Sequence, residues 1–288
     1  MKLEKLNALI TGGSQGLGKA IAEHFLREGA NVVICARNTK ELSTTRDDLA
    51  AKFPNQKVLA QTCDVANEAQ VNDLVAYAQR ELGAVGALVL NAGIYGPMGP
   101  TESVSLDEWR RAIEINLFGV LLPCRAMIPN FKQAGRGKIV VLSGGGATNP
   151  LPNISAYAAS KAAVVRLMET LAEELKPFHV DVNAIAPGAL ATRLVDEVLA
   201  AGADRVGEAF FAKNKQWKEK GAVPLELGAS LAVYLASAES VGITGKLISA
   251  QWDPWKDLQS HHEELAKSDI YCLRRIVPED RGKNWNPN

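Results

Sequence analysis

The fold of this chain is decided near its start by the stretch Thr11-Gly12-Gly13-Ser14-Gln15-Gly16-Leu17-Gly18. The stretch directly follows an apolar run over residues 6–11 and opens an amphipathic run over residues 17–28. Glycines at such a junction permit a tight turn, and the free N–H groups at the start of the following helix bind anions. The sequence therefore predicts a strand, a phosphate-binding turn and a helix in succession.

The alternation of strand and helix continues along the chain. Apolar runs without polar alternation predict buried strands over residues 6–11, 31–36, 57–63, 87–91, 138–143, 180–186 and, near the end, 244–250. Amphipathic runs between them predict helices over residues 17–28, 39–53, 68–82, 106–133 and 156–176. The fold class expected is α/β, a doubly wound parallel sheet of the Rossmann type.

Composition and charge exclude several other classes of protein. The chain has 288 residues, 47% apolar and 22% charged, which argues against disordered, collagen-like and coiled-coil chains. Basic and acidic residues both number 32, so the chain lacks the positive charge expected of a dedicated nucleic-acid binder. Its four cysteines form no close pair, and we expect no metal site. Without a signal-peptide core or 18 consecutive apolar residues, we expect no membrane span and a cytoplasmic location.

The spacing of the glycine turn, T-G-x-x-x-G-x-G, resembles that of the short-chain dehydrogenase/reductase family. Further elements that resemble this family follow in its order, over about residues 5–250. The resemblance implies a dinucleotide whose pyrophosphate is bound by the glycine turn, at Gly12, Ser14, Gln15, Gly16, Leu17 and Gly18.

The end of the second expected strand bears on which dinucleotide is bound. A carboxylate at this place suits the ribose 2′-OH of NAD(H), whereas a cation suits the 2′-phosphate of NADP(H). Ala36 provides no carboxylate and Arg37 provides a cation, so we expect NADP(H), with NAD(H) as the second choice. Gln15 stands where the family often has a second basic residue, and Arg37 could instead be a solvated surface charge.

Three later elements imply further cofactor contacts. Asp64 and Val65 resemble the family's D-V element beside adenine, although Asp64 could also cap the helix expected from residue 68. The sequence Asn91-Ala92-Gly93 resembles the N-A-G element, in which the asparagine can brace the sheet. The third element ends in Pro187 and Gly188, which would form the wall beneath the nicotinamide.

Thr192 follows this third element. The resemblance implies that it bonds the carboxamide or the pyrophosphate of the cofactor. The alternative is that Thr192 is an ordinary loop or N-cap residue.

The catalytic residues are implied by the family's Y-x-x-x-K pair, here Tyr157 and Lys161. Residues four apart share one helix face, and an ammonium near a phenol should lower the pKa of Tyr157. The tyrosine would exchange a proton with the substrate oxygen while hydride moves, and in the family the lysine also holds the nicotinamide ribose. Asn116 resembles the helix asparagine that supports a proton-relay water, or else it is a buried amide with a structural partner.

The substrate-orienting serine does not fall at the family's usual spacing in this chain. The family usually places it thirteen residues before the tyrosine, where this chain has Gly144, whereas Ser143 lies fourteen before. One reading is that the loop over residues 144–154 carries one extra residue, so that Ser143 takes the role. The other is that the hydroxyl is absent or comes from elsewhere, such as Ser155.

These residues predict an NADP(H)-dependent oxidoreductase that acts on a secondary alcohol or ketone. The alternative is a dinucleotide-binding regulatory or scaffold protein without turnover, for which Gly144 is the support. We expect residues 93–102 and 190–221 to line the pocket of a small-molecule substrate, whose bulk or negative charge would suit Phe210, Phe211, Lys213, Lys215 and Trp217. The family resemblance of the alanine-rich helix over 156–176 implies a homodimer or homotetramer, although from sequence alone its alanines could equally pack on the sheet.

The length allows two domains at ~150 residues each. The order of the motifs instead assigns residues 1–250 to one cofactor-binding domain. Residues 251–288 then form an extension, with a helix expected over residues 257–267, that we expect to cap the cleft or to cross to a neighbouring subunit.

Overall fold

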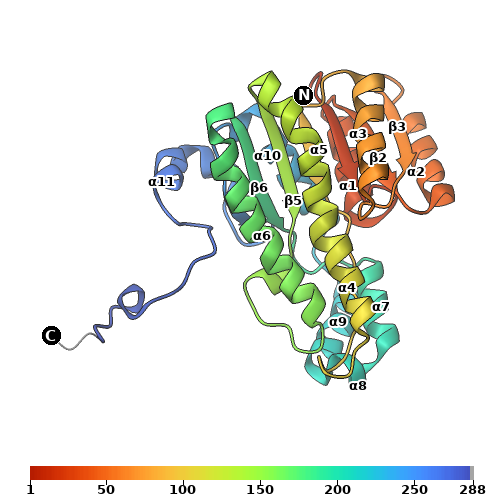
Figure 1. Ribbon diagram of the computed structural model, residues 1–288. Helices are drawn as coiled ribbons and strands as arrows, with labels where there is room; N and C mark the ends of the chain where they lie inside the picture. The colour runs from red at the N-terminus through yellow and green to blue at the C-terminus, as the bar shows by residue number, and fades with distance from the viewer. Residues whose placement is uncertain (286–288) are drawn as a thin grey trace.

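Seven parallel strands form the centre of the molecule. The computed structural model describes residues 1–285, and within them the strand order is β3-β2-β1-β4-β5-β6-β7 (Figure 1). The strands are β1 (Asn7–Thr11), β2 (Asn31–Ala36), β3 (Val58–Thr62), β4 (Ala87–Leu90), β5 (Gly137–Leu142), β6 (Val180–Ala186) and β7 (Leu247–Ser249). The central strands are buried on both faces, which is why their sequences are unbroken apolar runs.

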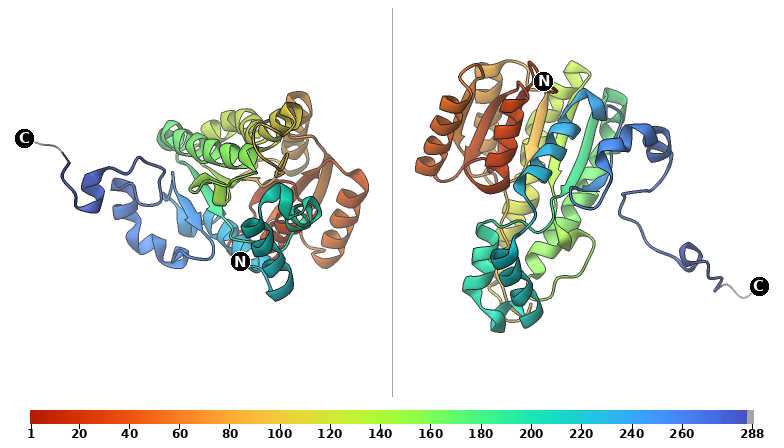
Figure 2. Two further views of the ribbon diagram at one scale, coloured as in Figure 1. Left: turned by 90° about the horizontal axis from the view of Figure 1, so that it is seen from below. Right: turned by 180° about the vertical axis from the view of Figure 1, so that it is seen from behind.

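Helices cover both faces of this sheet (Figures 1 and 2). One core contains Ile10 of β1 and the apolar sides of α1 (Gly16–Arg27), α2 (Thr39–Lys52) and α10 (Leu225–Ala236). The second core contains the adjacent Leu9 and the apolar sides of α3 (Glu68–Leu82), α5 (Gly119–Ala134) and α6 (Ser155–Leu175). Successive strand residues point to opposite faces, so the two cores lie on opposite sides of the sheet. The expected doubly wound α/β fold is confirmed.

The helix expected over residues 106–133 is divided by a π-helical turn. It runs from α4 (Leu106–Ile113) through η1 (Glu114–Phe118) into α5. This run, Leu106–Ala134, is long and apolar enough to cross a membrane by length and composition alone, with a mean hydropathy of 1.4. However, 44% of its apolar window is buried inside the protein, and core helices of soluble proteins share this composition.

Three helices follow β6 and form a group beyond the carboxyl ends of the strands (Figure 1). They are α7 (Arg193–Ala201), α8 (Ala203–Val206) and α9 (Glu208–Lys220). Their position lets side chains of this group reach the edge of the sheet where the glycine turn lies. Short 3₁₀ turns also occur at η2 (Gly145–Ala147), η3 (Lys176–Phe178) and η4 (Ala238–Ser240).

The chain beyond residue 250 first packs against its own domain. A 3₁₀ segment, η5 (Trp255–His261), and a short helix, α11 (His262–Lys267), stand where one helix was expected over residues 257–267. Trp255 is 8% exposed and its indole N–H donates to the Ala250 carbonyl at 3.1 Å. Its ring lies 5.9 Å from that of Tyr234 in α10, so this part of the extension belongs to the core.

The extension then covers the free edge of β7. The Leu247 N–H donates to the Tyr271 carbonyl at 2.8 Å, and Lys246 Nζ donates to the carbonyls of Ser268 and Ile270 at 2.9 and 3.0 Å. From Arg274 onward the chain, including η6 (Pro278–Arg281), extends away from the body of the molecule (Figures 1 and 2). Residues 286–288 of the expected extension lie outside the described residues.

Candidate active site

A cavity of about 1420 Å³ opens at the carboxyl ends of β1 and β4, where the strand order reverses. Such a switch point is where open α/β sheets bind their ligands. All but two of the residues expected at the site line it: Gly12, Ser14, Gln15, Gly16, Leu17, Arg37, Asp64, Val65, Asn91, Ala92, Gly93, Ser143, Tyr157, Lys161, Pro187, Gly188 and Thr192. The two exceptions, Gly18 and Asn116, lie behind this wall.

The glycine turn at one end of the cavity requires its glycines for space and for backbone conformation. Gly12 and Gly16 have φ values of +66° and +54°, in the left-handed region that favours glycine. A Cβ on Gly18 would lie 2.1 Å from the Gly12 carbonyl oxygen, so Gly18 lets α1 pack closely on the turn instead of contacting a ligand. No side chain caps the start of α1, which leaves its first N–H groups available to an anion.

Asn91 connects the glycine turn to β4. Its amide nitrogen Nδ2 donates to the carbonyls of Thr11 and Gly12, each at 3.1 Å, and its backbone N–H donates to Thr11 Oγ1 at 3.0 Å. These bonds join two strands that meet at the switch point, so Asn91 braces the turn while also lining the cavity.

The adjacent end of the cavity carries charges of both signs. The exposed Arg37 guanidinium has no hydrogen-bond or ion-pair partner within residues 1–285, whereas Asp64 forms an ion pair with Arg111. Burial alone would raise the pKa of Asp64, but the Ala66 N–H bond, Arg111 and, to a smaller extent, the charge of Arg37 lower it. Glu41 also lines this end, where its carboxylate accepts from Ser14 Oγ at 3.2 Å.

Two features of this end of the cavity were not predicted from the sequence. The N-cap of α3 is Asn67, which accepts from the Gln70 N–H at 3.1 Å, so the alternative role of Asp64 as this cap is wrong. Arg111 and Glu41 were not expected at the site. Neither carries a local motif, and Arg111 meets Asp64 across 47 positions of the sequence only through the tertiary fold.

Tyr157 and Lys161 lie on the inner face of α6. Lys161 is 5% exposed, and its Nζ donates to the Leu142 carbonyl at 2.8 Å and lies 5.7 Å from the centre of the Tyr157 ring. Burial lowers the pKa of Lys161 to about 8. Burial also raises the pKa of Tyr157, with a smaller contribution from Tyr95. The expectation that the Lys161 ammonium lowers the pKa of Tyr157 is therefore wrong in this structure, because desolvation of the phenolate dominates.

Gly144 lies directly against the Tyr157 hydroxyl. A Cβ on Gly144 would be 2.3 Å from Tyr157 Oη and 3.2 Å from its Cζ, so any side chain at this position would displace the Tyr157 hydroxyl from its place. The backbone of Gly144 is extended, with φ −176° and ψ 174°, so glycine is required here for space and not for conformation. The absence of serine at this position follows from the place of the tyrosine hydroxyl.

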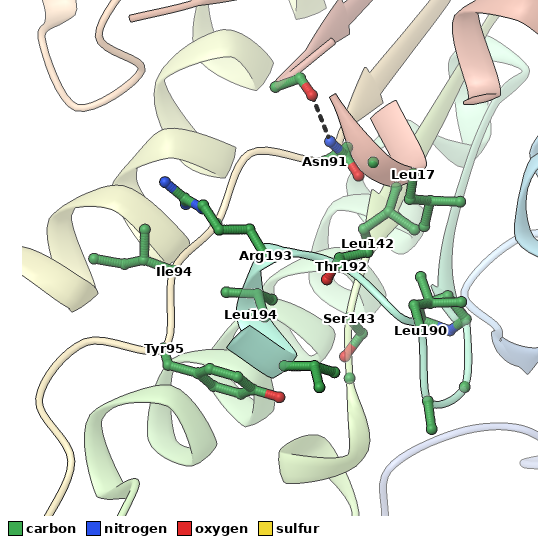
Figure 3. Close-up of a pocket in the computed structure, with 18 of the residues that line it drawn as sticks. Leu17, Asn91, Ile94, Tyr95, Leu142, Ser143, Leu190, Thr192, Arg193 and Leu194 are labelled. Carbon is green, nitrogen blue, oxygen red and sulfur yellow. Dashed lines mark hydrogen bonds between the residues drawn. The ribbon is translucent and has the colours of Figure 1, made fainter. Parts of the chain in front are cut away.

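The neighbouring Ser143 hydroxyl is buried and has no hydrogen-bond partner within the described chain. Figure 3 shows it turned toward the same cavity as the hydroxyls of Tyr95 and Thr192. Ser155, the other serine considered, accepts from the Trp109 indole N–H at 3.2 Å and does not line the cavity, so that alternative is wrong.

Asn116 lies in the π-helical turn with all its amide atoms bonded. Its Oδ1 accepts from the Ile94 N–H, and its Nδ2 donates to the Ile94 carbonyl and to Ser160 Oγ, each at 2.9 Å. Ser160 in turn donates to the Tyr157 carbonyl at 2.7 Å. Asn116 thus joins the loop after β4 to the catalytic segment of α6.

Aromatic side chains form the opposite end of the cavity. The Tyr95 ring lies 4.7 Å from that of Tyr157 and 6.4 Å from that of Phe210, in edge-to-face arrangements. Burial, and then the charge of Glu197, raise the pKa of Tyr95 to about 12, so its hydroxyl stays protonated. Of the residues expected in the pocket from α9, Phe210, Lys213 and Trp217 line it, whereas Phe211 and Lys215 do not.

Within its described residues, 251–285, the extension reaches this cavity only through its first residues. Gln251 and Trp252 line the mouth, and the Trp252 side chain is 79% exposed. The segment from Trp255 to Tyr271 packs elsewhere, against α10 and β7.

One cavity thus joins an anion-binding turn to a tyrosine and a lysine placed for proton transfer. A cofactor that carries hydride and a group that moves a proton are the two requirements of alcohol oxidation and carbonyl reduction. The class of protein defined by fold and site is an NAD(P)-binding oxidoreductase.

The chain belongs to the short-chain dehydrogenase family, whose family profile matches residues 6–202, and it is an enzyme acting on CH–OH groups. Glucose 1-dehydrogenase of Gluconobacter oxydans is 37% identical over 185 residues, which cover 64% of this chain and 69% of that protein.

Two solved structures of relatives have the same fold. NAD⁺-bound xylitol dehydrogenase superposes with a TM-score of 0.78 at 25% identity, covering 86% of this chain and 98% of the other. An NADPH-bound short-chain oxidoreductase from Pseudomonas aeruginosa PAO1, which has an atypical catalytic center, superposes with a TM-score of 0.76 at 30% identity. The superposition covers 88% of this chain and 98% of the other. Relatives of this chain therefore bind either dinucleotide.

Proposed function

We propose that this protein is an NADP(H)-dependent oxidoreductase that transfers hydride between the nicotinamide and a secondary alcohol or ketone. The observation that carries the proposal is the buried, partnerless Ser143 hydroxyl in the cavity that Tyr157 also lines. Ser143 directly precedes Gly144, which lies against the Tyr157 hydroxyl. The test is NADPH oxidation by the purified protein with a panel of ketones, and NADP⁺ reduction with the matching alcohols. A protein that turns over no member of either panel with either dinucleotide would contradict the proposal.

The residues at the glycine turn fit a dinucleotide. Gly16 would admit a Cβ with only Thr192 nearby, at 3.5 Å, so this side of the turn is open toward the cavity. The start of α1 and the Thr192 hydroxyl would hold the pyrophosphate, Asp64 and Val65 the adenine, and Lys161 the nicotinamide ribose. Ala92, Gly93, Pro187 and Gly188 would leave room for the nicotinamide. When bound, the cofactor supplies or accepts the hydride.

The proton would pass through Tyr157. Its hydroxyl donates a proton to the carbonyl oxygen when a ketone is reduced and accepts one when an alcohol is oxidised. Lys161, with a pKa of about 8, is mostly protonated at pH 7, and its charge favours the phenolate that burial disfavours. Ser143 donates a hydrogen bond to the same substrate oxygen. The side-chain amide of Asn116 is bonded to Ile94 and Ser160, so it acts as a structural brace. We assign Asn116 the support of a relay water from its place beside Gly93, which Lys161 also flanks.

Arg37 should set the preference for NADP(H). Arg37→Ala should weaken NADPH binding by about 10- to 100-fold, the worth of one charge-assisted hydrogen bond, and leave NADH binding unchanged. Dissociation constants for both cofactors can be measured by nicotinamide fluorescence. Arg46→Ala is the matched control, because Arg46 lies on the outer side of α2 in an ion pair with Asp47. If the unaltered enzyme preferred NADH tenfold, the assignment of NADP(H) as cofactor would be refuted. The Glu41 carboxylate at the same end of the cavity would then explain the preference, since a carboxylate suits the ribose 2′-OH of NADH.

Ser143→Ala should separate activity from stability. Because the hydroxyl is buried without a partner, its removal should not lower the melting temperature, and the unfolding free energy should stay within about 1 kcal/mol or rise. The kcat should nevertheless fall by about 10- to 100-fold, since the substrate oxygen loses a donor. Full kcat in this variant would exclude Ser143 as the orienting group.

We also propose the domain organisation, the kind of substrate, the location and the oligomeric state of the protein. We propose one domain over residues 1–250 with an extension over residues 251–288, a small-molecule substrate, a cytoplasmic location, and a homodimer or homotetramer. Half-buried apolar side chains on α5 and α6, such as Leu121, Ala163 and Leu167, support a subunit contact there. The relatives named above act on glucose and on xylitol, so their names do not select one substrate for this chain.

A further inference from the structure

Helix α9 presents one face to the substrate end of the cavity. Phe210, Lys213 and Trp217 are three and four residues apart, which places them on one side of the helix, and all three line the cavity. This face therefore contributes an aromatic ring, an ammonium group and an indole to the region beyond the catalytic tyrosine.

The side chains that line this region are suited to bind the apolar part of a substrate. The rings of Tyr95, Tyr157 and Phe210 follow one another at centroid distances of 4.7 and 6.4 Å. Further apolar side chains complete the lining: Ile94, Leu151, Leu190, Leu194 and Val223. A flat or cyclic carbonyl compound would bury its surface here, and burial of apolar area is the main source of its binding energy.

The charges around this region are unbalanced. The acidic residues among those that line the cavity are Glu41 and Asp64, and both lie at the end that would hold the adenosine. At the substrate end, Arg193 is paired with Glu197 at 3.2 Å. Lys213 has no carboxylate within 4.0 Å in the described part of the chain, so its positive charge is not compensated locally.

Lys213 is nevertheless held in place. Its Nζ lies 5.2 Å from the centre of the Trp217 ring, one helical turn away, in a cation–π contact. Two other lysines of α9 face outward and are neutralised there: Lys215 by Glu219 at 3.9 Å and Lys218 by Asp196 at 2.5 Å. Lys213 thus differs from Lys215 and Lys218 both in direction and in the lack of a counter-ion. Lys220 at the end of α9 has no carboxylate within 4.0 Å in the described residues either, but it does not line the cavity.

We propose that the substrate is an apolar, ring-bearing carbonyl compound or alcohol with a negatively charged group, and that Lys213 binds this group. The proposal rests on the oxidoreductase function and specifies its substrate class. The rings of Tyr95 and Phe210 hold the body of the substrate next to Tyr157, and the charged group lies toward the mouth of the cavity beneath α9. Because Lys213 is exposed there, water and salt screen its charge, so the attraction is moderate and falls with ionic strength.

The experiment compares carboxylates with uncharged compounds of the same shape. The probes are 3- and 4-acetylbenzoate and 4-acetylphenylacetate, each paired with its primary amide, at low and high salt. At low salt we expect kcat/KM for at least one carboxylate to exceed that of its amide by about 5- to 10-fold. Lys213→Met should remove this preference and leave the amides unchanged within about twofold, and Lys213→Arg should restore it. Lys215→Met should retain the preference.

A second readout separates this proposal from the oxidoreductase function. The Tyr157→Phe variant with NADP⁺ added reports binding of the same probes without turnover, by titration calorimetry. Tighter binding of a carboxylate than of its amide, lost with Lys213→Met, would support the anion site even if no probe were reduced. Turnover of the amides with no carboxylate preference would overturn the site while leaving the oxidoreductase function intact. Absence of a preference in both readouts, or a preference that survives in Lys213→Met, would also overturn it.

Discussion

Tyr157→Phe should lower kcat by about 10³-fold or more while leaving the affinity for NADPH within about twofold. General acid–base catalysis by one positioned group contributes ~10²- to 10⁴-fold, and this substitution removes only the hydroxyl that moves the proton. The ring stays, so its contacts with Tyr95 and with the Lys161 ammonium stay as well. Steady-state kinetics with the best ketone and fluorescence titration with NADPH measure the two quantities.

Two other tyrosines provide controls for this result. Tyr77 lies on α3 and does not line the cavity, so Tyr77→Phe should leave kcat unchanged. Tyr95→Phe removes a hydroxyl from the cavity wall next to Tyr157 and should change kcat/KM by less than about tenfold, mainly through KM. Normal turnover by Tyr157→Phe would show that another group carries the proton.

Gly144→Ser should lower kcat by about 100-fold, although it introduces serine at the place where the family usually has it. Any side chain at this position puts its Cβ within 2.3 Å of Tyr157 Oη, so the tyrosine must move. The atom displaced is the end of a side chain and not backbone, so the protein should still fold. A displacement of about 1 Å at the reacting group can cost ~10²-fold in rate.

The adjacent glycine makes this test specific. A Cβ on Gly145 would meet no atom within 4 Å, so Gly145→Ala should retain both activity and melting temperature. Gly144→Ala should behave like Gly144→Ser, since the Cβ alone causes the clash. Equal or higher kcat in Gly144→Ser would mean that the Tyr157 hydroxyl does not occupy this place during turnover.

The sequence predicted those features that depend on neighbouring residues. The glycine turn, the strand ends and the spacing of Tyr157 and Lys161 are local patterns, and the structure places nearly all of these residues around one cavity. The boundaries of β2 and β6 match the predicted runs because strands buried on both faces have a continuous apolar signal. The division of the helix at Asn116 was not predicted, since a π-helical turn has no simple sequence pattern.

The features that the sequence could not predict depend on contacts between distant elements. The ion pair of Asp64 with Arg111 joins residues 47 positions apart, and the extension after Ala250 enters the core through Trp255. The direction of the Tyr157 pKa is another such feature. A Tyr–Lys spacing indicates a favourable charge, but the degree of burial decides how far desolvation opposes it.

By itself, the sequence determined the order of strands and helices and the family, because apolar periodicity and short motifs are read along the chain. The tertiary structure decided why Gly144 stands where a serine was expected, since only the approach of α6 to the end of β5 brings the Tyr157 hydroxyl into the space of a side chain. It also decided which lysine of α9 faces the cavity, because helix orientation is set by packing. The local spacing of motifs thus predicted the class of reaction. The proposed substrate contacts could be found only from the contacts between distant elements.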